Sequence, residues 1–198
     1  MTHLALDVPR SAFRVRAFAV ALGALLVAAA AQVAIPLPGT PVPMTLQPMA
    51  VLLVGGLLGA PLGALSMILY LAMGAAGLPV FTPTVPLLGF ARLIGPTGGY
   101  LLAYPLAAYA VGAIVPPLRK ERGPGGEDTG RWARVAVGVF AGLVLIHLGG
   151  LAQLLILTGN LSAAARFGTA PFLLGDLIKI AVLVPVLAKL TPTVRARL

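Results

Sequence analysis

The chain has 198 residues, of which 59% are hydrophobic and 10% are charged, and its mean hydropathy is +1.02. A soluble domain of this size could not bury so much apolar surface, so the composition excludes that class and indicates a polytopic membrane protein. The net charge of +9 does not indicate binding to nucleic acid, because the basic residues cluster beside apolar runs, where they fix membrane orientation. The absence of cysteine excludes disulfides and thiolate metal sites.

The apolar runs predict an all-α fold that forms a single integral membrane domain over residues 1–198. A membrane span needs ~20 residues, so the chain has room for about six transmembrane helices and no separate soluble domain. Each predicted span corresponds to one apolar run, and the six lie at about residues 15–35, 49–58, 61–77, 98–118, 135–157 and 171–190.

The first span carries a stripe of small residues. Its alanines recur at spacings of four and three, which places their methyl groups on one face of a helix: Ala17, Ala21, Ala24, Ala28 and Ala31. Small residues let another helix approach closely, and close packing is a main source of helix association in lipid. The stripe therefore predicts a docking surface for a partner helix. The alternative is that it packs inside the chain's own bundle.

The second and third runs are short and adjoin each other at a Gly- and Pro-rich junction. The 49–58 run of about ten residues extends roughly 15 Å as a helix, which is too short to cross a ~30 Å hydrocarbon core alone. Interrupted membrane segments of this kind can line a polar cavity. Thr45 and Gln47 lie at the entry to this segment and are candidate pocket residues. An ordinary helical hairpin is the alternative.

An apolar loop at residues 78–97 separates the third and fourth spans. Its four prolines remove backbone donors and forbid a continuous helix, and its one charge is Arg92. An apolar, proline-stiffened loop with one cation is typical of a cap that folds over a pocket and holds a small ligand. A loop that only seals the helix bundle is the alternative.

Residues 119–134, RKERGPGGEDTGRWAR, are hydrophilic and are predicted to be a cytoplasmic loop. With both termini in the cytoplasm, eleven basic residues lie inside and only Arg92 and Arg166 lie outside. This asymmetry predicts that the cap faces outward.

The strongest chemical signal is the segment GDLIK at residues 175–179. Asp176 is the only acid within a predicted span, and Lys179 follows three residues later, so the two side chains share one helix face. Ionisable side chains within a membrane segment are costly, so they are taken first as candidates for a functional site. The alternative is a structural ion pair in which the two side chains only bond each other. His147, alone on the apolar fifth span, is interpreted as a core histidine whose hydrogen bonds are satisfied.

Other motifs exclude classes of function. The sequence has no HExxH motif, no clustered carboxylates and no serine elbow, so it predicts neither an enzyme nor a metal or cofactor site. It also lacks any Gly-Lys dipeptide and therefore has no P-loop. Any ATP-driven work must come from partner subunits.

Four segments resemble the BioY family, the biotin-specific substrate-binding subunits of energy-coupling-factor (ECF) transporters. They are PVPMTLQ at 41–47, LGAPLGALSMILYLAMGAAGLPVF at 58–81, GPTGGYLL at 95–102 and GDLIK at 175–179. The resemblance implies a six-helix bundle in the cytoplasmic membrane whose outer loops close over biotin. It also implies docking onto a transmembrane coupling subunit driven by two ABC-type ATPases, with Ala17, Ala21, Ala24 and Ala28 as contacts.

The chemistry of biotin agrees with the candidate residues. Asp176 would accept hydrogen bonds from the ureido N–H groups, while Lys179 or Arg92 would meet the ureido carbonyl or the carboxylate. The secondary polar candidates are Tyr100, Thr45 and Gln47, and the apolar part of the ligand would lie against Phe81 and Leu78. A stand-alone secondary carrier and a subunit for a different vitamin-like ligand remain alternatives.

Overall fold

The computed structural model describes residues 10–115 and 129–198, and this part of the chain is a helical bundle. Six of the described helices have 12 or more residues. They are α1 (Arg10–Gln32), α2 (Gln47–Leu58), α3 (Ala60–Ala75), α5 (Gly98–Ile114), α6 (Thr129–Thr158) and α8 (Leu173–Arg195).

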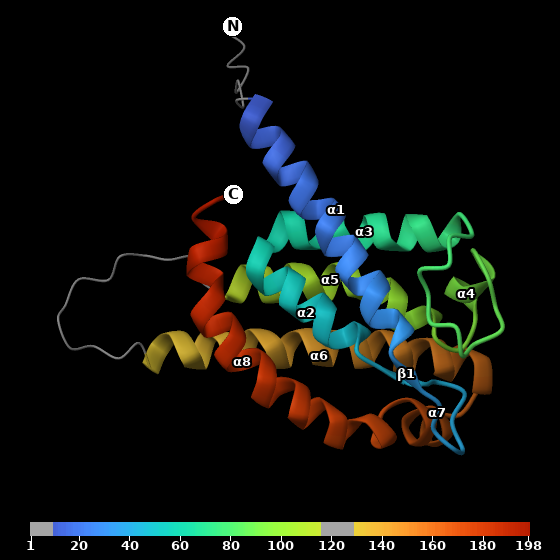
Figure 1. Ribbon diagram of the computed structural model, residues 1–198. Helices are drawn as coiled ribbons and strands as arrows, with labels where there is room; N and C mark the ends of the chain where they lie inside the picture. Colours follow the sequence, from blue (N-terminus) through green and yellow to red (C-terminus); the bar gives the residue numbers. More distant parts are fainter. Residues whose placement is uncertain (1–9, 116–128) are drawn as a thin grey trace, which may run out of the picture.

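Short elements lie between these helices. Two two-residue strands, β1 (Ala34–Ile35) and β2 (Met44–Thr45), pair antiparallel with Ala34 opposite Thr45. The others are α4 (Ala91–Ile94), α7 (Leu161–Gly168) and the 3₁₀ turn η1 (Ala170–Phe172). In Figure 1, β1, α4 and α7 gather at one end of the bundle and the C-terminus lies toward the other.

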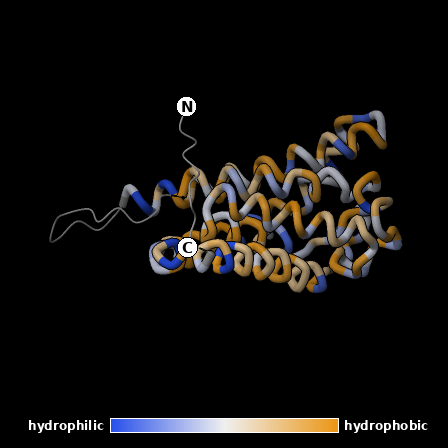
Figure 2. Tube along the Cα trace, turned by 90° about the horizontal axis from the view of Figure 1, so that it is seen from above, coloured by the Kyte–Doolittle hydropathy of each residue, from blue (hydrophilic) through white to orange (hydrophobic). Residues whose placement is uncertain are grey.

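The surface of the bundle is apolar. Within the described residues, three helical stretches are long and apolar enough to cross a membrane, Ser11–Gln32, Gly130–Thr158 and Leu161–Arg195, and α2, α3 and α5 are shorter apolar helices. Large side chains such as Phe18, Leu106 and Ile156 are 70%, 65% and 77% exposed. Figure 2 shows hydrophobic residues along most of each helix. Such a surface is costly in water and favourable in lipid, so the chain is an all-α membrane protein.

Glycine determines where two pairs of helices meet. Gly59 separates α2 from α3 at φ +86°, a conformation that L side chains rarely adopt, so the junction predicted between these segments is confirmed. Gly99 of α5 lies against Gly149 of α6. A Cβ atom on either glycine would overlap the backbone carbonyl of the other, so these two helices approach at backbone distance.

The predicted boundaries fail at the start of α6. This helix begins at Thr129, six residues before the predicted 135, so the prediction of a loop is wrong for residues 129–134. The rest of that loop, 119–128, lies outside the described residues. Charged side chains do not end a helix, because they take part in none of its backbone hydrogen bonds. The helices α4 and α7 were also not predicted.

The alanine stripe of α1 divides into two parts. Ala24 and Ala28 are 0% and 8% exposed, because this face of α1 packs on the chain's own helices. Beside them, a Cβ atom on Gly23 would overlap Ser66 of α3. The prediction that Ala24 and Ala28 contact a partner is therefore not supported. Ala17 is exposed and Ala21 is half-buried, and for these two it stays a prediction.

Candidate functional site

A pocket opens among the loops at the end of the bundle where β1, α4 and α7 gather. It holds about 610 Å³ of space that no atom fills, and this volume includes the open space at its mouth. Apolar side chains from the cap, α5, α6 and η1 form much of its lining. The polar side chains in the lining are Thr45, Gln47, Thr82, Arg92, Thr97, Tyr100, Tyr104, His147, Asp176 and Lys179.

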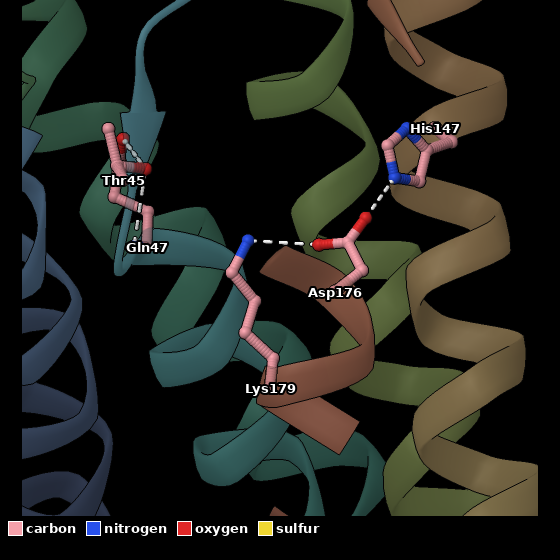
Figure 3. A network of polar contacts seen from close by, with 5 residues as sticks. All are labelled: Thr45, Gln47, His147, Asp176 and Lys179. Atoms are coloured by element: carbon pink, nitrogen blue, oxygen red, sulfur yellow. Dashed lines mark hydrogen bonds and ion pairs between the residues drawn. The ribbon is translucent and has the colours of Figure 1, made fainter. Parts of the chain in front are cut away.

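Asp176 lies between two nitrogen-bearing side chains (Figure 3). Lys179 Nζ donates to Asp176 Oδ1 at 2.9 Å, and His147 Nε2 lies 2.6 Å from Asp176 Oδ2. Asp176 and Lys179 are each 7% exposed. Asp176 is also the only carboxylate side chain among the described residues. We call these three residues the Asp176 cluster.

Arg92 is the second charged group in the pocket lining. It comes from α4 in the cap and is 2% exposed. Its Nη2 donates to the carbonyl of Thr82, whereas Nε and Nη1 have no hydrogen-bond partner among the described residues. Burial lowers the pKa of the Arg92 guanidinium from its ordinary value, but arginine stays protonated in proteins. Thr97 Oγ1 is also buried without a partner. The pocket therefore holds N–H and O–H donors without a partner, and a ligand oxygen could accept hydrogen bonds from them.

A hydrogen-bond chain leads from the pocket lining to the cap. Thr45 Oγ1 donates to Gln47 Oε1 at 3.2 Å, and Gln47 Nε2 donates to the Tyr70 hydroxyl at 2.5 Å. The Tyr70 hydroxyl in turn donates to the carbonyl of Val80 at 3.2 Å. This chain joins the start of α2 to α3 and to the cap, so it fixes the orientation of Gln47.

Residues 79–82, which we call the wall segment, form one side of the pocket through Phe81 and Thr82. Its four carbonyls accept hydrogen bonds from side chains of three helices. Gln32 of α1 donates to residues 79 and 81 at 3.4 Å each, Tyr70 donates to residue 80, and Arg92 donates to residue 82. The Phe81 ring packs on Gly74, where a Cβ atom would overlap it. The wall segment is thus positioned by its neighbours.

Tyr100 connects α5 to α7 beside the Asp176 cluster. Its hydroxyl donates to the carbonyl of Gly168 at 2.5 Å, and its ring lies edge-on to His147 with centroids 6.4 Å apart. Within the part of the chain that the structure describes, no three His, Asp or Glu side chains form a group that could hold a metal ion. The arrangement is suited to binding a small molecule that combines polar ends with an apolar body.

The model of the BioY family matches residues 7–196. This chain belongs to the BioY family. It is 34% identical to the probable biotin transporter BioY of Pyrococcus horikoshii, over 86% of this chain and 93% of that protein. It is 36% identical to the biotin transporter BioY of Thermotoga maritima, over 79% of this chain and 84% of that one.

One solved structure shares the fold of this BioY family member. It is the crystal structure of the S-component for biotin from an ECF-type ABC transporter, with a TM-score of 0.77 and 24% identity. The match covers 93% of this chain and 94% of that chain. At this identity the likeness supports the arrangement of the helices and says nothing of individual site residues.

The structure brings most of the predicted site residues into one pocket. Seven of them are in its lining: Asp176, Lys179, Arg92, Tyr100, Thr45, Gln47 and Phe81. Leu78 is the exception, since its side chain is 50% exposed and is not part of the lining. It directly precedes the wall segment but points elsewhere, so its predicted role as an apolar wall is wrong.

The sequence analysis missed several lining residues. His147 was interpreted as a satisfied core histidine, but it lines the pocket, contacts Asp176 and leaves Nδ1 without a partner. Thr97 lies within the GPTGGYLL segment and could have been chosen on that ground. Tyr104 gave no signal, because a tyrosine in a membrane helix is more often an interfacial anchor.

Proposed function

We propose that this chain captures biotin at the outer face of the cytoplasmic membrane as the substrate-binding subunit of an ATP-driven ECF transporter. The observation that carries the proposal is the pocket. Its lining combines Asp176, the only carboxylate side chain among the described residues, with Arg92, a buried arginine from a different helix that has donors without a partner. Biotin has a ureido ring, an apolar bicycle and chain, and a carboxylate. The names of the family's curated relatives support the same ligand, and describe transporters and no enzymes.

Asp176 accepts the ureido N–H groups in this proposal. A carboxylate has about four lone-pair sites, and each oxygen of Asp176 has one protein partner, so lone pairs remain for the ligand. Lys179, held beside it, donates to the ureido carbonyl. Hydrogen bonds to charged groups contribute about 1.5–3 kcal/mol each, so these contacts account for much of the affinity.

Arg92 binds the carboxylate of biotin. Its Nε and Nη1 have no hydrogen-bond partner among the described residues, and each has an N–H group that a carboxylate oxygen can accept. Lys179 is less suited to this role because its charge is already paired with that of Asp176. The Thr97 hydroxyl is a further donor, and Phe81 packs against the apolar part of the ligand.

We further propose that six helices cross the membrane with both termini in the cytoplasm, so that the pocket faces outward. The distribution of basic residues supports this orientation. A transmembrane coupling subunit and two ABC-type ATPases would supply the energy, since the sequence contains no P-loop. Biotin uptake by cells that lack those subunits would instead indicate a stand-alone carrier.

Calorimetric titration of the purified chain with biotin tests the ligand. We expect one-to-one binding and a loss of about 2–3 kcal/mol, or about 30- to 150-fold in Kd, in Asp176→Asn. Lys179→Met should also weaken binding, whereas Lys189→Met, an exposed lysine on the same helix, is the matched control. If the folded chain gives no heat with biotin, the ligand is a different one. Unchanged affinity in Asp176→Asn would refute the proposed site.

A further inference from the structure

We propose that His147 is a positioning residue, which holds the Asp176 carboxylate in the orientation that the ligand requires. The inference rests on the proposed function, because it takes Asp176 as the acceptor for ligand N–H groups. It concerns a residue whose sequence context, a lone histidine on an apolar helix, gives no indication of such a role.

The geometry shows why His147 matters for the carboxylate. Lys179 lies on the same helix as Asp176 and approaches only Oδ1. His147 comes from α6 and contacts Oδ2 at 2.6 Å, so it connects the carboxylate to a second helix. The terminal torsion of an aspartate is broad, and a lysine side chain is flexible. His147 is therefore the contact that fixes the plane of the carboxylate.

The contacts also indicate the direction of the short hydrogen bond. An ionised carboxylate only accepts, so Nε2 of His147 donates to Oδ2 of Asp176. Nδ1 of the same ring is buried and has no hydrogen-bond partner among the described residues.

The groups around His147 hold its ring in place. From α8 it faces Asp176, from α5 the ring of Tyr100, and from η1 the apolar ring of Phe172. Contacts from three elements therefore keep Nε2 directed at Oδ2, and the remaining lone pairs of the carboxylate stay available to the ligand N–H groups.

Calorimetric titration of the full chain with biotin tests the inference. His147→Gln keeps an N–H donor for Oδ2, so its affinity should stay within about twofold of wild type. His147→Leu should bind about tenfold more weakly than wild type, since it leaves Oδ2 unpaired.

His3→Gln, which changes the chain's other histidine, is the matched control and should retain the wild-type affinity. An unchanged affinity in His147→Leu, or an equal loss in His147→Gln and His147→Leu, would overturn the inference while leaving biotin binding intact. Absence of biotin binding by the folded wild type would overturn the proposed function itself. If His147→Leu does not fold, the affinity of His147→Gln relative to wild type still decides the matter.

Discussion

Replacement of Arg92 by methionine should weaken the binding of biotin through one specific group of the ligand, its carboxylate. Arg92 is already desolvated and held by its bond to the wall segment, so little of its own burial cost remains to be met when the ligand arrives. Two charge-assisted bonds contribute about 1.5–3 kcal/mol each, and desolvation of the carboxylate offsets part of that. We therefore expect a coupling of about 2–3 kcal/mol, which corresponds to about 30- to 150-fold in Kd.

A thermodynamic cycle that combines the protein variant with a modified ligand separates this coupling from structural damage. Arg92→Met also removes the donor to the Thr82 carbonyl and can loosen the wall segment, which would weaken any ligand. Calorimetric titration of wild type and variant with biotin and with biotin methyl ester gives four affinities. The ester has no charged carboxylate, so wild type should bind it much more weakly than biotin. The variant should discriminate little between the two.

The result that would refute this reasoning is an equal loss of affinity for both ligands in Arg92→Met. In that case Arg92 would act only through the wall segment. If Lys179→Met removed the discrimination between acid and ester in its place, the carboxylate would lie at the Asp176 cluster, and the assignment of the two ends of biotin would be reversed.

Three further changes test the packing of the helix bundle and of the wall segment. Arg195→Gln should lower the thermal unfolding temperature in detergent, because the guanidinium donates at 2.7–3.1 Å to carbonyls at the ends of α2 and α5, and it should leave biotin affinity unchanged. The control Arg197→Gln, at an exposed position, should change neither the unfolding temperature nor the affinity. Gly99→Ala should lower the free energy of unfolding by about 1–3 kcal/mol through overlap with α6, and Gly138→Ala, whose Cβ would meet only side chains, by less. Gln32→Met removes a donor to the wall segment and should speed biotin dissociation about fivefold in a radiolabel chase, and an unchanged rate would show that this contact does not hold the segment.

The ends of helices at the pocket were predictable where proline and glycine occur. Proline lacks a backbone donor, so the loops at residues 36–48 and 78–97 could be located from sequence, as could the break at Gly59. The start of α6 was not predictable in this way. Residues 129–134 include Thr129, Arg131 and Arg134, yet side-chain polarity reports where a helix leaves the apolar core rather than where it ends.

The charged part of the site was predictable for an energetic reason. A charge within a membrane helix is so costly that Asp176 and Lys179 attract notice by themselves. His147 and Thr97 attract less notice, since threonine is uncharged and histidine has a neutral form. Their place in the pocket follows from the packing of α6 against α8 and of the cap against α5, and local sequence spacing does not encode those long-range contacts.

The first helix shows the same limit for interaction surfaces. A repeat of small residues predicts that a helix face is closely packed, but it does not identify what packs there. In α1 the surroundings of the alanines change along the stripe. Ala24 and Ala28 are buried by the chain's own α2 and α3, whereas Ala17 is exposed. Gln32, at the end of the same helix, bonds the wall segment of the pocket. The same helix thus carries an exposed small residue, Ala17, near one end and a donor to the pocket wall, Gln32, at the other.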